Sequence, residues 1–155
     1  MCAMLRKCLV LTLVVLLAAC ESVGDDPPPE LTEEVMAALS ARALAIACEQ
    51  QCIGDEVPIR DLVYEAAEAT PLAGPPLSDV QRQAMTQQFT QVTFLSDAEA
   101  GEMLADDGVV LAVGPVTEIE PGTVQAEVLA QGSDSQTIYQ LRYQWSGGDW
   151  VPIPE

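Results

Sequence analysis

The chain has 155 residues, of which 24 are Asp or Glu and only six are Lys or Arg, so its formal charge at pH 7 is −18. This balance excludes nucleic-acid binding, because that affinity comes mainly from basic residues that neutralise phosphates. The sequence contains no histidine, which excludes Ser-His-Asp catalysis, Cys-His catalysis and histidine metal sites.

The first twenty residues follow the plan of a secretory signal. Arg6 and Lys7 form a positive start, Leu9 to Leu17 is an apolar run, and Ala18-Ala19 are the small residues of a cleavage site. A membrane-spanning helix needs about 20 apolar residues, whereas the stretch from Cys8 to Cys20 supplies only 13. We therefore predict a signal segment over residues 1–19 and not a spanning helix.

The segment Leu17-Ala18-Ala19-Cys20 resembles the lipobox of bacterial lipoproteins, in which a small pair precedes an obligatory cysteine. The resemblance implies that the Cys20 thiol receives a diacylglyceryl group, that residues 1–19 are removed, and that the new amino terminus is acylated, for example with palmitate. Several acyl chains on one residue meet the requirement for stable anchoring, which one chain does not. The alternative is an ordinary secreted protein with a chance cysteine at the cleavage site.

The same resemblance implies a location in the bacterial cell envelope, with the domain facing the periplasm or the exterior. Glu21 replaces the aspartate that marks inner-membrane retention, which implies the outer membrane if the source is Gram-negative. The expected partners are the membrane, through the acyl chains on Cys20, and an unidentified envelope protein or small molecule.

Residues 20–30 are predicted to be the lipidated cysteine and a tether. Pro27-Pro28-Pro29 favours polyproline II, so the ten residues from Glu21 to Glu30 could hold the domain about 30 Å from the bilayer. Without residues 1–19, four arginines remain against 24 acids, a side-chain charge of about −20. Such a charge is not attracted to anionic headgroups, so the acyl chains must supply the anchoring.

Cys48 and Cys52 remain in the exported chain, and an oxidising compartment favours a disulfide between them. Helical residues four apart have Cβ atoms about 5–6 Å apart, whereas a disulfide needs about 3.5–4.5 Å. We therefore expect a disulfide that closes where the helix ends near Cys52, with Gly54 as the cap. The alternatives are free thiols, a redox pair, for which C-x3-C is the wrong spacing, and a metal site, for which two thiolates are too few.

Residues 31–155 are predicted to form one α+β domain that starts with a helix. The alanine-rich stretch from Leu31 to Ile53 has helical composition, with Thr32 as its N-cap. Its larger apolar residues are expected to form one stripe: Leu31, Val35, Leu39 and Ile46. Val57 to Tyr64 is predicted to be a short edge strand, because Pro58 is tolerated there, and residues 65–76 have the composition of a linker.

Two capping boxes mark further helix starts. Ser78 with Gln81, and Ser96 with Glu99, have the spacing at which the serine and the N3 side chain satisfy free N–H groups reciprocally. The first box opens a helix whose expected inward residues are Val80, Ala84, Met85 and Phe89. The second opens a short helix that Gly108 ends, and Val92 to Leu95 is a strand candidate between them.

From Val109 onward the pattern becomes β. Val109 to Val113 is apolar on both faces, which predicts a central strand ended by Gly114-Pro115. Thr123 to Ala130 and Thr137 to Trp145 alternate between apolar and polar residues. The predicted fold is therefore α+β, with an N-terminal helix and shorter helices packed on an antiparallel β-sheet that ends in a meander.

The closing segment Trp145-Ser-Gly-Gly-Asp-Trp150 predicts a hairpin with a two-residue glycine turn of the primed type. Trp145 and Trp150 then lie opposite each other in a non-hydrogen-bonded pair, where side chains approach closely. The pair either closes the core or forms a stacking site for a sugar or aromatic ligand.

Residues 76–152 are also similar to a group of uncharacterised bacterial exported proteins. The shared features are a capped helix, the stretch GVVLAVGPV and the closing YQLRYQWSGGDWVP. The resemblance implies an architecture and no activity.

Paired carboxylates are the remaining catalytic option, because acidic glycosidases need only two. Asp106-Asp107 and Glu118 with Glu120 are the candidates, although 24 acids make such pairs by chance. Calcium binding is a further option at four acids, although the D-x-D-x-D-G loop is absent: Asp97, Glu99, Asp106 and Asp107. We expect a non-catalytic binding module without catalytic residue, cofactor or metal, and the alternative is a carboxylate-dependent hydrolase in the envelope.

Overall fold

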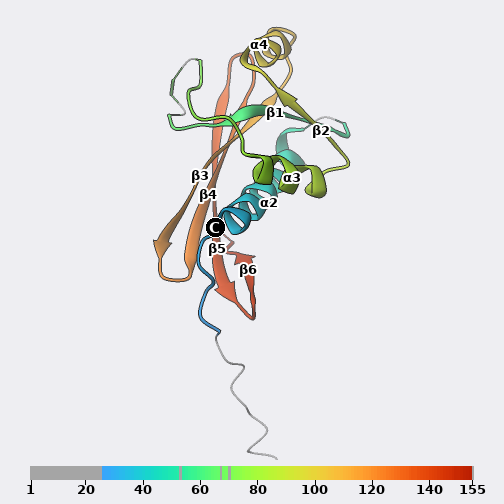
Figure 1. Ribbon diagram of the computed structural model, residues 1–155. Coiled ribbons are helices and arrows are strands. Elements are labelled where there is room, and N and C mark those ends of the chain that lie inside the picture. The colour runs from blue at the N-terminus through green and yellow to red at the C-terminus, as the bar shows by residue number, and fades with distance from the viewer. Residues whose placement is uncertain (1–25, 53, 67, 70, 155) are drawn as a thin grey trace, which may run out of the picture.

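The computed structural model describes residues 26–52, 54–66, 68–69 and 71–154. In this part of the chain, helices lie against a six-stranded sheet with the strand order β2-β1-β3-β4-β5-β6 (Figure 1). The helices are α2 (Glu33–Gln51), α3 (Asp79–Gln88) and α4 (Asp97–Ala105). The strands are β1 (Glu56–Val63), β2 (Gln91–Leu95), β3 (Val110–Glu120), β4 (Thr123–Gln131), β5 (Gln136–Ser146) and β6 (Asp149–Pro152). The α+β class is confirmed; Cys20 and the tether up to residue 25 lie outside the described residues.

The sheet has an antiparallel half and a parallel half. Strands β3, β4, β5 and β6 form the predicted C-terminal meander, with every neighbouring pair antiparallel. Strand β1 runs parallel to both β2 and β3, and α3 and α4 provide the crossover connections that parallel strands require. The sheet is therefore mixed, which the sequence pattern did not predict.

Two strand predictions were wrong, one in the strand's place in the sheet and the other in where the strand ends. Strand β1 is not an edge strand, because β2 and β3 flank it. Pro58 is accommodated because the pairing with β3 begins one residue later, at Ile59. Strand β3 does not end at Gly114-Pro115 but continues to Glu120 through a register shift between Val113 and Val116. Such an irregularity lets a proline sit within a strand.

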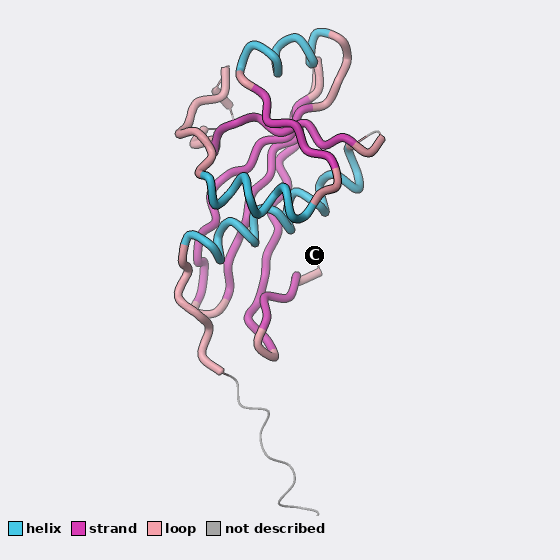
Figure 2. Tube along the Cα trace, turned by 45° about the vertical axis from the view of Figure 1, so that its right-hand side comes forward, coloured by secondary structure: helices cyan, strands magenta, loops and turns pink. Residues whose placement is uncertain are grey.

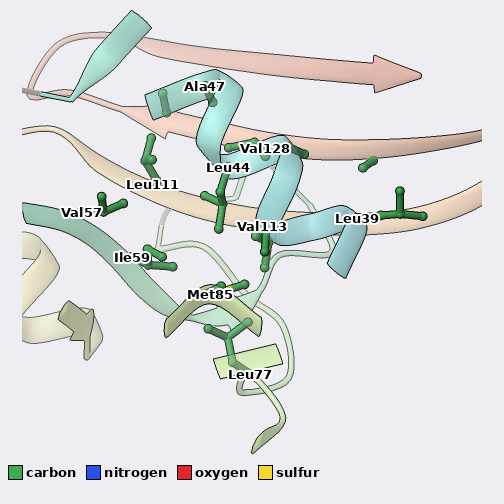
Figure 3. Packing of buried hydrophobic residues seen from close by; sticks show 14 of the residues in the cluster. Leu39, Leu44, Ala47, Val57, Ile59, Leu77, Met85, Leu111, Val113 and Val128 are labelled. Atoms are coloured by element: carbon green, nitrogen blue, oxygen red, sulfur yellow. The ribbon is translucent and has the colours of Figure 1, made fainter. Parts of the chain in front are cut away.

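Helix α2 is buried on a broader face than the predicted stripe. It packs on β3 and β4 and also against α3, so small residues between the larger ones are covered too: Ala37, Ser40, Ala41, Ala43 and Ala47. Figure 3 shows Leu44 near Val113 and Val128, with Met85 and Leu77 on the α3 side of the core. The small alanine side chains let both the sheet and α3 approach this face of the helix closely. Ile46 lies outside this buried face.

The helix caps follow the sequence closely. Thr32 caps α2, and both predicted capping boxes form, at Ser78 and at Ser96. The end of α4 differs in one detail, because Asp107 and not Gly108 takes the left-handed conformation, with φ 59°. The Asp107 N–H then bonds to the Leu104 carbonyl and the Gly108 N–H to the Met103 carbonyl, the two bonds of a Schellman motif.

The two ends of the molecule differ in character (Figures 1 and 2). The turns at Pro121-Gly122 and Gly147-Gly148 lie at one end, which we call the hairpin end. Helix α4 and the C-terminus of α2 lie at the other, which we call the helical end. The chain enters the described part at the hairpin end, where Asp26 lies beside Trp145.

Candidate functional site

The tryptophan hairpin forms as predicted. Gly147 and Gly148 both have positive φ angles, 63° and 86°, which is the signature of a type I′ turn. Trp145 pairs with Trp150, and their ring centroids lie 5.5 Å apart in an edge-to-face arrangement. Trp150 belongs to the buried core and Trp145 packs against it, an arrangement that suits the core-closing alternative.

Arg42 of α2 holds this hairpin against the helix. Its Nη1 donates to the backbone carbonyl of Trp150 at 2.9 Å, and both Nη atoms donate to the Asp149 carboxylate. The guanidinium hydrogen bond and the Trp150 N–H lower the pKa of Asp149. The contact links residues more than one hundred positions apart, so no local sequence pattern could have indicated it.

Residues 26–30, which we call the proline segment, lie against the same hairpin. The Trp145 indole Nε1 donates to the Asp26 carbonyl at 2.8 Å. Asp26, Pro27 and Pro28 share a hollow of about 320 Å³ with Gly122 and Trp145. The hollow beside Trp145 is thus lined on one side by the chain's own prolines.

The disulfide expectation matches the geometry at the helical end. The Sγ atoms of Cys48 and Cys52 lie 2.06 Å apart, with a Cα–Cα distance of 4.8 Å. Helix α2 ends at Gln51 and Cys52 is already extended, with φ −77° and ψ 140°, so the helix ends where the bond requires it. Gly54 has a positive φ of 95° just beyond.

A hollow of about 270 Å³ lies beside this disulfide. Its walls include Cys52, Pro58 and Met103, and two carboxylates, Glu56 and Asp107, also line it. Glu56 accepts a hydrogen bond from the Thr93 hydroxyl. Asp107 is a candidate from the sequence, whereas Glu56 is not, because 51 positions separate the two in the chain and no local pattern links them.

One side of β5 has no strand partner over part of its length. Strand β6 pairs with β5 only from Tyr143 to Ser146, and the Ile153 N–H adds one bond to the Arg142 carbonyl. Within the described chain, β5 therefore has a strand neighbour from Thr137 to Leu141 on its β4 side alone. Since outward-pointing groups alternate along a strand, the backbone N–H and C=O of Ile138 and Gln140 face this open side.

This open side borders a groove of about 540 Å³, which we call the β5 groove. Ile46 and Gln50 of α2 form one wall, residues 137–141 form the other, and Ile153 and Pro154 close one end. The lining has no charged residue, whereas four other hollows of the described chain each have at least one acid. In a chain of this charge, an uncharged groove beside an open strand edge is distinctive.

Three more of the acids named from the sequence, Asp97, Glu99 and Glu118, have structural contacts. Asp97 accepts from the buried Arg60 at 2.8 Å, and Glu99 completes the capping box, where the Ser96 hydroxyl and N–H lower its pKa. Glu118 accepts from the Gly122 N–H in the β3–β4 turn. Among the described residues, no three Cys, Asp or Glu side chains gather closely enough to hold a metal ion.

The sequence did not predict one polar cluster, which forms around Tyr64 and Glu127. Tyr64 lies over Gly114, where an added Cβ would be 2.6 Å from the ring, and its hydroxyl donates to Glu127 at 3.3 Å. Gln125 and Gln140 also donate to Glu127. Burial and then the Glu127 charge raise the pKa of Tyr64. Gly114 was the only available signal, since a glycine within a strand often marks such a close approach.

Comparisons of the chain with protein-family models, with curated proteins and with solved structures found no match. None of the helices in the described part is long and apolar enough to cross a bilayer.

Proposed function

We propose that this chain is a lipid-anchored protein of the bacterial cell envelope whose folded domain is a non-catalytic binding module. The anchor is the acylated Cys20, and the domain faces the periplasm or the exterior. In a Gram-negative source, Glu21 directs it to the outer membrane. The proposal for the anchor is supported by the order of positive start, apolar run and lipobox in residues 1–20.

The β5 groove is the observation that carries the binding role. Ile138 and Gln140 offer two backbone N–H groups and two carbonyls to a neighbour, and an added strand would use them in the way that strand-addition modules do. The side chains of that strand would lie against Ile46 and Ile153, which line the groove. The partner that fits is an extended, uncharged and β-branched segment of another envelope protein.

Selection of displayed heptapeptides on the purified domain tests this role. We expect enriched peptides to be uncharged, to alternate apolar and polar residues, and to slow hydrogen exchange at the Ile138 and Gln140 amides. Gln140→Pro removes one outward-facing donor that an added strand would use, so it should abolish peptide binding. The variant should still fold, because the lost N–H makes no internal bond. Gln140→Ala keeps that donor and is the matched control. Peptides that bind both variants equally would contradict strand addition.

A lipid-based test addresses the anchor separately. Mass spectrometry of the native protein should find an acylated Cys20 as its first residue, and Cys20→Ser should release the chain from membranes. An unmodified thiol, or residues 1–19 still present, would exclude the lipoprotein assignment.

A carboxylate-dependent hydrolase is the second candidate, because Glu56 and Asp107 line one hollow at the helical end. Glycosidases of this kind place two carboxyl groups on either side of the scissile bond. Hydrolysis of a glycoside panel that is lost in both Glu56→Gln and Asp107→Asn, and retained in Asp106→Asn, would favour this function. If the chain hydrolyses none of these glycosides, the hydrolase is excluded and the binding role remains as the proposed function.

A further inference from the structure

The proline segment is held at the hairpin end by contacts on two sides. The Trp145 indole donates to the Asp26 carbonyl at 2.8 Å, and a Cβ built on Gly122 would lie 3.6 Å from the Pro28 ring. Trp145 is itself fixed by its contact with Trp150, whose carbonyl Arg42 binds. The segment therefore docks on a rigid part of the fold.

Prolines suit such a contact for a physical reason. A run of prolines is already confined to the polyproline II conformation, so docking it on an aromatic side chain costs little conformational entropy. Docking shortens the free part of the chain before the domain. Only six residue steps separate Cys20 from Asp26, and they span at most about 20 Å when fully extended.

The direction of the domain follows from where this short connection ends. Helix α2 begins directly after the proline segment and has 19 residues, so its far end lies about 28 Å away along the helix axis. Helix α4 lies toward that far end (Figures 1 and 2), and Cys52, just after the last residue of α2, lines a hollow together with Met103 of α4. We infer that the anchored domain stands with its hairpin end against the bilayer and its helical end directed away from it. This inference rests on the proposed anchoring through Cys20.

The hairpin end lies at the bilayer surface and does not insert into it. The hairpin end has exposed acids beside the turn between β3 and β4, Glu118 and Glu120, which anionic headgroups repel within a Debye length of about 8 Å. Without the docked proline segment, this repulsion would turn the hairpin end away from the surface. The hydrogen bond from Trp145 and the packing of Pro28 are therefore what set the orientation.

Energy transfer from a dye on the domain to acceptor-labelled headgroups measures this orientation. The chain is acylated in cells, purified and reconstituted in vesicles of phosphatidylcholine with anionic phosphatidylglycerol, with a single dye on Glu120→Cys at the hairpin end or on Ala98→Cys in α4. Both positions are exposed, and Cys20, Cys48 and Cys52 carry no free thiol in the acylated, oxidised chain. Transfer should be several-fold more efficient from position 120 than from position 98.

Two variants that loosen the proline segment test the cause. Trp145→Phe keeps an aromatic ring but removes the donor to Asp26, and Pro27→Gly with Pro28→Gly frees the segment without touching the core. Both should bring the two transfer efficiencies together, and circular dichroism checks that each variant is folded.

The outcomes separate this inference from the anchoring itself. A chain that floats with the vesicles but transfers energy equally from both positions, or better from position 98, overturns the orientation and leaves the anchor standing. An unchanged difference in both variants overturns the role of the proline segment. A chain that does not float with the vesicles refutes the anchor, and the orientation with it.

Discussion

Replacing Arg42 with methionine should weaken the attachment of the β5–β6 hairpin to α2 while keeping the aliphatic part of the side chain in place. The guanidinium makes two kinds of contact, one hydrogen bond to the Trp150 carbonyl at 2.9 Å and an ion pair with Asp149 at 3.2 Å. Methionine retains the packing of the stem against the helix surface. The change therefore removes the polar contacts with little loss of apolar burial.

The two contacts contribute unequally to the free energy of unfolding. A hydrogen bond from a charged donor to a partly buried carbonyl contributes about 1.5–3 kcal/mol. The ion pair is exposed, since the Arg42 and Asp149 side chains are 42% and 63% accessible, and such pairs contribute about 0–1 kcal/mol. We expect Arg42→Met to cost about 2 kcal/mol of unfolding free energy, and Asp149→Asn to cost clearly less, because asparagine can still accept from the Trp150 N–H.

Urea unfolding followed by tryptophan fluorescence measures both variants. The chain has two tryptophans, and both lie in this hairpin, so fluorescence reports the hairpin while circular dichroism reports the whole domain. If Arg42→Met and Asp149→Asn lower the unfolding free energy equally, or if Arg42→Met leaves it unchanged, the hydrogen bond to the Trp150 carbonyl does not provide most of the stabilisation.

The pH dependence gives an independent check on the ion pair. The pKa of Asp149 is lowered from its ordinary value of 3.8, first by the Arg42 hydrogen bond and then by the Trp150 N–H. A carboxyl with a lowered folded-state pKa stabilises the fold above its unfolded value and loses that contribution as the pH falls through the folded value. The stability difference between the native chain and Arg42→Met should therefore narrow as the pH drops below about 4.

Three further changes have expected outcomes. Reducing the disulfide, or replacing Cys48 and Cys52 with serine, should lower the unfolding free energy by about 2 kcal/mol, because a loop this short restricts the unfolded chain only modestly; an unchanged urea midpoint would contradict this. Gly108→Ala should cost about 1–3 kcal/mol, since its Cβ would lie 2.5 Å from the Met103 side chain, and a neutral effect on thermal unfolding would argue against the close contact. Burial raises the pKa of Tyr143 to about 12, so its contribution to the unfolding free energy is present below pH 10 and should be lost between about pH 10 and 12. If Tyr143→Phe has the same alkaline unfolding curve as the native chain, ionisation of the Tyr143 hydroxyl is not the cause of that loss.

The features that the sequence predicted well depend on residues close together in the chain. Both capping boxes use residues three apart, and the Trp145–Trp150 pair needs only the two glycines between its strands. In each case the local backbone conformation is sufficient to fix the contact. The disulfide belongs to the same class, because Cys48 and Cys52 can meet once α2 ends.

The errors arose where distant segments decide the outcome. Pro58 suggested an edge strand, but β2 and β3 lie on both sides of β1 because α3 and α4 return the chain in parallel. The predicted stripe of α2 included Ile46, whereas contact with α3 as well as the sheet selected the alanine face. The hollow with Glu56 and Asp107, and the β5 groove, each combine a helix with strands far along the chain, so neither could be assembled from spacing alone.

The position of the proline segment also decides which partner suits the open edge of β5. Two copies that paired these edges in antiparallel fashion around Tyr139 would direct their hairpin ends in opposite directions. Trp145 lies six residues from Tyr139, about 20 Å along the strand, so the two Trp145 side chains would be about 40 Å apart along the strand axis. The connection from Cys20 to Asp26 spans at most about 20 Å, so two copies standing on one bilayer could not both remain anchored in this arrangement. If the domain is anchored upright as proposed, we therefore expect the edge to bind a segment of a different protein, and crosslinking through Gln140→Cys on intact membranes should yield a heterologous product and not a homodimer.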